Sequence, residues 1–169
     1  MNFTFRGGNS KDIDKLSRLV LAQPLNYIGY KTWAKKALEE FRCGIKQAGL
    51  CFCNDHLVGE LIYQQHKSIN IFCELKNGRV LDKFRRRFIL SFLIRQVEFD
   101  ARENGYLAVV CDSRSDRTDV NDLLLINGYK VIAQADLYRE GFKDCIYLKP
   151  LVKEESLLVP ARRGLIRPS

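Results

Sequence analysis

Three consecutive arginines, Arg85, Arg86 and Arg87, stand where a strand-like segment gives way to a helical pattern. That pattern comes from apolar residues recurring at the spacing of one buried helix face: Phe84, Phe88, Ile89, Phe92, Leu93 and Val97. The arginines would then occupy the first helical turn, where the macrodipole already presents partial positive charge. Cations there are mildly unfavourable unless an anion lies among them, so the pattern indicates a phosphate site. A solvated basic helix end is the alternative interpretation.

The whole chain is basic, and its positive charge is concentrated around the three arginines. Of its 169 residues, 28 are Lys or Arg and 20 are Asp or Glu, which gives a net charge of +8. The segment 76–95 holds seven Lys or Arg residues against a single Asp, a local charge of +6. Such an excess implies an anionic partner, but it does not choose among a nucleotide cofactor, a nucleic acid and an acidic protein.

The cysteines and histidines do not have the spacing of a metal site. No C-x-x-C pair occurs among the six cysteines, and only His56 and His66 could add imidazole ligands. We therefore expect no metal and expect reduced, mostly buried thiols. The chain begins with Met1 and runs straight into polar sequence, and its longest apolar run, 88–94, is too short to span a bilayer. We expect no signal peptide, no membrane association and a cytoplasmic location.

The positions of turn residues and the apolar periodicity predict seven strands and four helices. The predicted strands are 3–6, 50–53, 56–65, 69–80, 106–111, 130–137 and 144–148. Helices are expected from Ser10 as N-cap to Pro24, from about Thr32 to Gly49, from the arginines to Asn104-Gly105, and over 119–126. The element order is β-α-α-β-β-β-α-β-α-β-β. This order predicts a mixed α/β layer fold, in which helices flank a mostly antiparallel central sheet of six to seven strands.

Three segments in this order resemble the GNAT acetyltransferase superfamily, from about residue 3 to about residue 150. Val80 to Leu93 (VLDKFRRRFILSFL) stands where the family has its acyl-CoA sequence R/Q-x-x-G-x-G/A. Leu123 to Tyr129 (LLLINGY) is similar to the family's short helix with its Gly-aromatic end, and Leu137 to Leu151 is similar to its closing hairpin. We therefore expect a GNAT-like domain over 1–151, followed by a basic tail over 152–169.

The resemblance implies acetyl-CoA as cosubstrate, bound at the splayed end of strand 69–80. The implied cofactor-binding residues are Arg79, Val80, Arg85, Arg86, Arg87, Phe88, Ile89 and Leu90. Backbone amides of the loop 85–90 would surround the pyrophosphate. The chain departs from the family here, because the two glycines of the motif fall on Phe88 and Leu90, whose side chains could occupy that space. The alternative for Phe88 is a simple core position.

The resemblance also implies a proton acceptor for the attacking amine and a proton donor for the leaving thiolate. Glu74, on the strand that leads to the loop, is the candidate base, and Tyr138 is the candidate acid. A strand carboxylate paired with a lysine and a packing tyrosine are the alternative interpretations. Glu60 is a second, weaker candidate. The tyrosine that is frequent in the family falls on Leu124 here, and its frequent asparagine falls near Arg117.

The sequence thus favours an N-acyltransferase, with acetyl as the expected acyl group and an unidentified amine as acceptor. A catalytically inactive GNAT-like module, which acts through a protein or nucleic-acid partner, is the alternative. The missing glycines favour it, and so does the tail, where 157–159 is apolar and 161–163 is basic. Direct nucleic-acid binding by the basic helix ranks third, because Phe84, Phe88 and Phe92 are expected to be buried rather than exposed for stacking.

Overall fold

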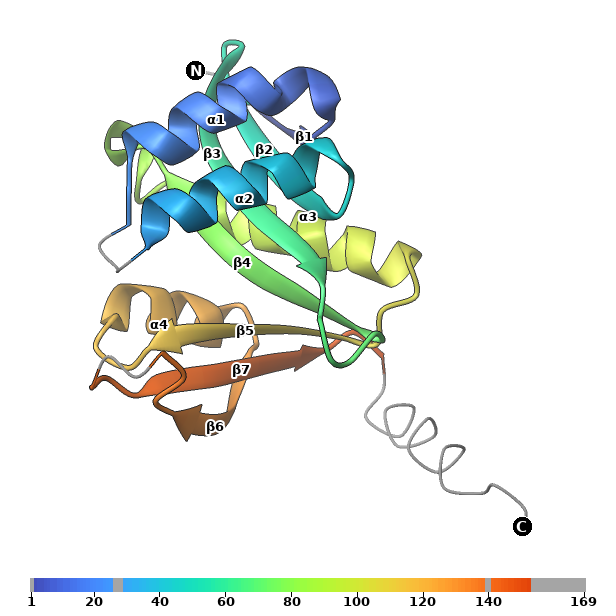
Figure 1. Ribbon diagram of the computed structural model, residues 1–169, viewed down its shortest axis with the longest axis vertical. Helices are drawn as coiled ribbons and strands as arrows, with labels where there is room; N and C mark the ends of the chain where they lie inside the picture. The colour runs from blue at the N-terminus through green and yellow to red at the C-terminus, as the bar shows by residue number, and fades with distance from the viewer. Residues whose placement is uncertain (1, 26–28, 139–140, 153–169) are drawn as a thin grey trace. The chain divides into compact units, whose positions relative to one another are not determined.

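The computed structural model describes residues 2–25, 29–138 and 141–152 and confirms the predicted order of strands and helices (Figure 1). Its strands are β1 (Phe3–Gly7), β2 (Lys46–Cys53), β3 (His56–Gln65), β4 (Phe72–Val80), β5 (Ala108–Arg114), β6 (Lys130–Ala135) and β7 (Asp144–Pro150). Its helices are α1 (Ile13–Ala22), α2 (Tyr30–Arg42), α3 (Ile89–Glu103) and α4 (Thr118–Ile126), with 3-10 turns η1 (Ser10–Asp12) and η2 (Asp82–Phe84). Of the predicted tail 152–169, residues 153–169 lie outside the described residues.

The strands form a seven-stranded sheet in the order β1-β2-β3-β4-β5-β7-β6. The pairings of β1 with β2, β2 with β3, β5 with β7 and β6 with β7 are antiparallel, whereas β4 pairs with β5 in parallel. This confirms the predicted mixed, mostly antiparallel sheet. The chain divides into two compact units, Met1–Gln64 with Leu75–Val97 and Gln65–Glu74 with Glu98–Ser169, called here the first and second unit.

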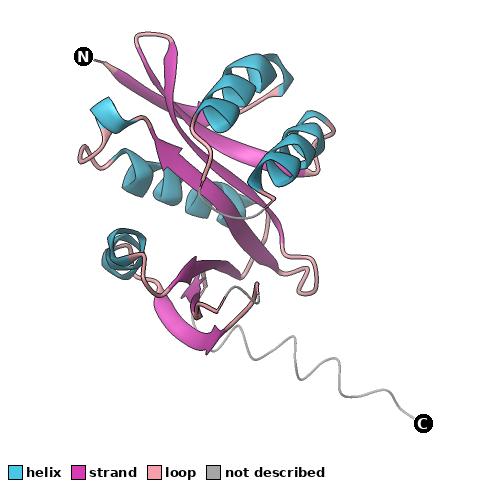
Figure 2. Cartoon of the chain, turned by 60° about the vertical axis from the view of Figure 1, so that its left-hand side comes forward, coloured by secondary structure: helices cyan, strands magenta, loops and turns pink. Residues whose placement is uncertain are grey.

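In the first unit, helices cover both faces of the strands (Figures 1 and 2). Successive side chains of a strand point to opposite faces, so Ala48, Leu50 and Phe52 of β2 share one face. These three join a buried core with α1 and α2. The opposite face receives α3. At Gly59 a Cβ would lie only 3.0 Å from Cγ2 of Ile89, so the absence of a side chain on β3 permits the close approach of this helix.

Two predicted helix boundaries are wrong, and capping explains both. Asn9, rather than Ser10, is the first N-cap: its side chain accepts from the Lys11 amide, and Asp12 accepts from the Asn9 amide, which completes a capping box. The second helix ends at Arg42, well before Gly49, which lies within β2. Gly44 stops it in the left-handed region at φ 75°, where its amide and the next one bond the last carbonyls in a Schellman motif.

The second unit is built on β5, β7 and α4. Its core includes Leu124, Tyr129 and Tyr147, all buried. Lys149 on β7 ties the unit together, since its ammonium donates at 2.7 Å both to Glu98 of α3 and to the carbonyl of Asn127 at the end of α4. Burial of an ammonium group is unfavourable, and hydrogen bonds to two acceptors offset most of that unfavourable free energy.

Neither a membrane-spanning helix nor a metal-binding cluster occurs in the part of the chain that the structure describes. No helix there is long and apolar enough to cross a membrane. In the same residues, no group of three or more His, Cys, Asp or Glu side chains is placed to hold a metal ion. The cysteines are free thiols; Cys43 is exposed, and Cys51, Cys53, Cys73, Cys111 and Cys145 are buried. Burial raises the pKa of the Cys51 thiol to about 11 and that of Cys73 to about 12, so these thiols are protonated at neutral pH.

Candidate functional site

The loop between β4 and α3 is the part of the first unit that the sequence singled out. After the η2 turn, which Phe84 anchors in the core, residues 85–88 form a loop, and α3 begins only at Ile89. The prediction that the three arginines form the first helical turn is therefore wrong, because they precede the helix. Two residues of the loop, Arg86 at φ 60° and Phe88 at φ 58°, adopt the left-handed conformation that favours glycine.

The predicted buried face of α3 is wrong at two positions. Phe84, Ile89, Leu93 and Val97 are buried, as predicted, but Phe88 is 77% and Phe92 is 50% exposed. Two apolar rows overlap here, Phe88–Phe92 and Ile89–Leu93–Val97, and one residue of offset turns a helix by about 100°. Only the second row continues into a wide apolar stripe with Ile94 and Ala101, so that row faces the sheet. The ring of Phe92 lies 5.3 Å from that of Phe5.

The two residues at the glycine positions of the motif behave differently. The side chain of Leu90 lies over β4 at Gly78, where an added Cβ would be only 3.0 Å from Leu90 Cδ1 and 3.0 Å from Leu61 Cδ1. Its isobutyl group therefore fills the space that Gly78 leaves. The ring of Phe88 extends into solvent instead. The predicted obstruction by two side chains thus reduces to one exposed ring beside the loop backbone.

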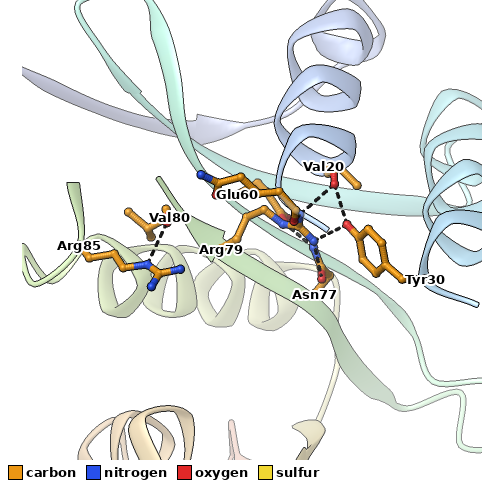
Figure 3. Close-up of polar contacts among 8 residues, drawn as sticks. Val20, Tyr30, Glu60, Asn77, Arg79, Val80 and Arg85 are labelled. Carbon is orange, nitrogen blue, oxygen red and sulfur yellow. Dashed lines mark hydrogen bonds and ion pairs between the residues drawn. The ribbon is translucent and has the colours of Figure 1, made fainter. Parts of the chain in front are cut away.

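The three arginines are not equivalent. Arg85 pairs with Asp82 at 3.0 Å, and its Nε donates at 3.4 Å to the Val80 carbonyl (Figure 3). Within the described residues, the side chains of Arg86 and Arg87 make no hydrogen bond or ion pair, and both residues are exposed. The backbone amides of residues 86–88 likewise have no acceptor among the described residues. Successive amides in a turn with left-handed residues can bind an anion, and guanidinium groups close to them in the chain can add positive charge.

Arg79, predicted to bind the cofactor, has its side chain in a buried network (Figure 3). Its guanidinium donates to Glu60 Oε1 at 2.9 Å, to Asn77 Oδ1 at 3.1 Å and to the hydroxyl of Tyr30 at 2.5 Å. It also donates to the carbonyls of Val20, at 2.9 Å, and of Gln23. Arg79 thus satisfies carbonyls that the end of α1 leaves without helical partners. The guanidinium of Arg79 therefore connects the end of α1 and the start of α2 to strands β3 and β4.

Glu60, considered as a base, is the acceptor at the centre of this network. The residue is fully buried, and Oε1 accepts from Asn77 at 2.5 Å as well as from Arg79, while Oε2 has no hydrogen-bond partner among the described residues. Burial raises the pKa of this carboxyl to about 7, although Arg79 and Asn77 both favour the charged form. Because the side chain is fully buried and accepts from two side chains of β4, it stabilises the fold and does not face solvent.

The remaining predicted site residues, Glu74 and Tyr138, lie in the second unit. Glu74 is half-buried near the start of β4, where it pairs with Val110 in the last of the three residue pairs between β4 and β5. The hydroxyl of Tyr138 donates to Asp112 Oδ2 at 2.7 Å. Burial is the largest cause that raises the pKa of this phenol, and the carboxylates of Asp112, Asp144 and Glu74 raise it further. Tyr138 is thus a weak acid whose proton is already donated to a carboxylate.

Asp112 is the residue that the sequence interpretation missed. Two signals pointed to it: it directly follows the predicted strand 106–111, although β5 continues to Arg114, and it is acidic in a basic chain. Of the other predicted positions, Val80 and Ile89 are buried, with Ile89 against β3. Leu124, at the family's tyrosine position, is a core residue, 4% exposed.

Comparisons with known proteins give the fold a context. No protein-family model matches the sequence. No curated protein matches it either. Solved structures do match. A GNAT-family acetyltransferase from Bacillus cereus has a TM-score of 0.72 at 13% identity, with 90% of this chain and 100% of that chain covered.

Two further structures are similar to this chain over nearly the same span. Ard1 from Thermoplasma volcanium has a TM-score of 0.72 at 16% identity, with 90% of this chain and 100% of that chain covered. The yncA protein of Salmonella typhimurium, solved with its cofactor acetyl-CoA, has a TM-score of 0.68 at 14% identity, covering 90% of this chain and 96% of that chain. These likenesses confirm the predicted GNAT fold.

Proposed function

We propose, from the premise that this chain has the fold of the GNAT acetyltransferases, that it is an acyl-CoA-dependent N-acyltransferase with acetyl-CoA as its cosubstrate. The observation that carries the proposal is the loop 85–88. It has left-handed backbone at Arg86 and Phe88, amides without acceptors in the described structure, and two guanidinium groups without partners. A loop that lost its ligand would be free to relax to an unstrained backbone, whereas this one keeps the conformation that glycine usually provides.

The residues present are compatible with acyl-CoA. Arg86 and Arg87 would bind the pyrophosphate together with the backbone amides of residues 86–88 and with the positive end of α3, whose first amides have no intrahelical acceptor. Leu90 does not interfere, because its side chain lies against Gly78. The ring of Phe88 is exposed and can turn about its side-chain bonds without loss of packing. Arg79 is left out of the proposed cofactor contacts, because its guanidinium is buried in the first unit.

Acyl transfer to an amine requires a residue that accepts a proton from the amine. Acyl-CoA, when bound, supplies an acyl group activated as a thioester, and a neutral amine displaces the thiolate with loss of one proton. We assign the removal of that proton to Glu74, a half-buried carboxylate. Tyr138 fits a binding role better than that of an acid, because its hydroxyl already donates to Asp112.

Calorimetric titration of the purified protein with acetyl-CoA tests the proposal. Binding in the micromolar range, about −8 kcal/mol, is expected, and it should weaken in Arg86→Ala/Arg87→Ala. Lys31→Ala/Lys35→Ala is the matched control, since it removes two exposed charges from α2 of the first unit. No heat and no thermal shift with acetyl-CoA would overturn the proposal, and so would equal binding by the two double variants.

The alternative is a GNAT-fold binding module that has lost acetyl-CoA and acts through a protein or nucleic-acid partner. One observation favours it: Phe88 and Phe92 are exposed beside Arg86, Arg87 and Arg95, which removes the reason for ranking nucleic-acid binding last. Exposed rings close to arginines can stack on bases. A salt-dependent affinity for single-stranded oligonucleotides, lost in Phe88→Ala and Phe92→Ala, together with no response to acetyl-CoA, would favour this second function.

A further inference from the structure

Strand β1 lies at the end of the sheet, and one of its two edges is unpaired in the described structure. It is first in the strand order, and β2 is its neighbour. Two bonds that flank this ladder show how its backbone groups point: the Gly8 amide donates to Ala48, and the Asn54 amide donates to Asn2. Directly opposite residues of an antiparallel ladder alternate between bonded and unbonded pairs, so the even-numbered residues of β1 bond β2. The amides and carbonyls that point away from β2 are therefore those of Phe3, Phe5 and Gly7.

These outward groups are available for a further strand. Among the described residues, only the Gly7 carbonyl accepts a hydrogen bond, from the Arg6 guanidinium at 3.0 Å, and a carbonyl has a second lone pair. Lysine, proline or a bulge protects many natural edge strands. Strand β6, at the other end of the order, begins at Lys130 and has an irregular register against β7. Strand β1 has no lysine or proline, and its register against β2 is continuous.

The outward groups are arranged symmetrically about Phe5, which favours a second copy of β1 as the partner. A two-fold axis between two antiparallel β1 strands sets Phe5 opposite Phe5 of the second copy and Phe3 opposite Gly7. Each of these opposed pairs can exchange two hydrogen bonds. Every outward amide and carbonyl of both strands is then satisfied, so the edge is complementary to itself, as a two-fold interface requires.

The side chains that face α3 are compatible with this pairing. The ring of Phe5 lies 5.3 Å from that of Phe92, and two opposed Phe5 residues would bring their own rings together across the axis. Phe3 of one copy would lie beside Gly7 of the other, where an added Cβ meets nothing within 4 Å. Phe92 is 50% exposed, so it adds apolar surface beside the paired strands.

The charges on the other face of β1 are also compatible. Thr4 and Arg6 lie there, and the guanidinium of Arg6 pairs with Asp12 at 2.7 Å. Pairing about Phe5 sets Arg6 opposite Thr4 of the second copy, and no arginine stands opposite another. These are non-hydrogen-bonded pairs, in which opposed side chains are closest, so like charges there would be unfavourable. The register that satisfies the backbone is thus also free of charge repulsion within the strands.

We propose that the chain forms a two-fold symmetric homodimer in which the two β1 strands pair antiparallel about Phe5. The occupant of the free edge is a second copy of this chain. Because a strand of 5 residues with a few rings buries a small area, we expect a weak dimer with a micromolar Kd. The pairing requires no acyl-CoA, so the inference does not depend on the proposed acyl transfer.

Sedimentation velocity of the purified full chain, from micromolar to millimolar concentrations, measures dimerisation, and amide hydrogen exchange followed by NMR locates the interface. In the monomer, β2 protects the amides of Thr4 and Arg6, whereas those of Phe3, Phe5 and Gly7 exchange freely. In the dimer, the amides of these three residues should become protected as well. Their protection should increase with protein concentration, whereas that of Thr4 and Arg6 should change less.

Two substitutions at the exposed Thr4 form a matched pair. Thr4→Lys sets a cation opposite Arg6 of the second copy, and Thr4→Glu sets a carboxylate there. Both variants retain every backbone group of β1, and the dispersion of their NMR spectra shows whether they are folded. Because each change occurs twice at a two-fold interface, Thr4→Lys should raise the Kd of the dimer about tenfold, whereas Thr4→Glu should lower it or leave it unchanged.

A chain that is monomeric at every concentration overturns the proposal. So does a dimer in which the amides of Phe3, Phe5 and Gly7 exchange as fast as in the monomer, because such a dimer uses another surface. Equal Kd values for the two Thr4 variants would refute the register about Phe5. A monomer that binds acetyl-CoA refutes this inference but not the acyltransferase, and a β1-paired dimer that does not bind acetyl-CoA refutes only the acyltransferase.

Discussion

The backbone at Phe88 leads to a prediction whose sign can be checked. Phe88 has φ 58°, where a residue with a Cβ costs about 1–2 kcal/mol relative to the right-handed region. The residue is 77% exposed, so truncation of its side chain removes little buried area. Glycine relieves the left-handed strain and alanine retains it. We expect Phe88→Gly to exceed Phe88→Ala in free energy of unfolding by about 1 kcal/mol, after the larger unfolded-state entropy of glycine is subtracted.

Phe92 is the matched control for this comparison. It is also an exposed phenylalanine, four residues further on, but it lies inside α3. Glycine in a helix interior is about 1 kcal/mol less favourable than alanine, so Phe92→Gly should be less stable than Phe92→Ala. The sign of the glycine–alanine difference should therefore reverse between the two positions.

Urea unfolding of the four variants, followed by circular dichroism, measures both differences. For a chain of this length, 1 kcal/mol corresponds to about 2–4 °C in Tm. If Phe88→Gly is no more stable than Phe88→Ala, the left-handed assignment is refuted, and the support that the loop gives to acyl-CoA binding is lost with it. Titration of the same variants with acetyl-CoA shows whether the ring obstructs the loop: both Phe88 variants should then bind more tightly than the wild type.

Replacing residues 85–87 with alanine should weaken acetyl-CoA binding about tenfold or more and flatten its salt dependence, since guanidinium charges supply the attraction; calorimetry at low and high salt that finds no change would remove the anion site. Gly78→Ala should cost about 1–3 kcal/mol, because its Cβ would lie 3.0 Å from Cδ1 of Leu90 and of Leu61. Leu90→Ala in the same chain should recover part of that loss, and strict additivity in a double-mutant cycle would contradict the contact. Burial raises the pKa of Glu60 in the folded state to about 7, against an ordinary 4.5. The protonated carboxyl therefore stabilises the folded state fully below about pH 4.5, and this stabilisation is lost as the pH rises through 7. Relative to Glu60→Gln, the wild type should lose about 3 kcal/mol across this range in urea unfolding, and parallel pH profiles would refute the assignment.

The order of strands and helices was predicted well because local sequence patterns specify each of them. The hairpin of β2 and β3, with Asn54-Asp55 between the strands, was confirmed, and so was the order of all eleven main elements. Each depends on periodicity and turn residues within about a dozen positions. Helix ends were less well predicted, since Asn9 competes with Ser10 as a cap, and Gly44 with Gly49 as a stop.

The site was only partly predictable. The arginine loop was correctly located beside the end of β4, since charge and sequence order alone identify it. The hydrogen-bond partners of the other predicted site residues were not predictable. Arg79 donates to the carbonyl of Val20, 59 residues earlier, and Tyr138 donates to Asp112, 26 residues earlier. No periodicity or local propensity specifies such a pair.

The sequence by itself determined the succession of strands and helices, the basic segment around residues 85–87 and the resemblance to the GNAT fold. Only the tertiary structure decided which of two apolar rows of α3 is buried, that Leu90 fills the space above Gly78, and that one carboxylate oxygen of Asp144 has no donor within the described residues. The reason is physical. Strand and helix patterns arise from interactions between near neighbours in the chain, whereas the phase of a helix and the satisfaction of a buried charge depend on which distant segments pack against them.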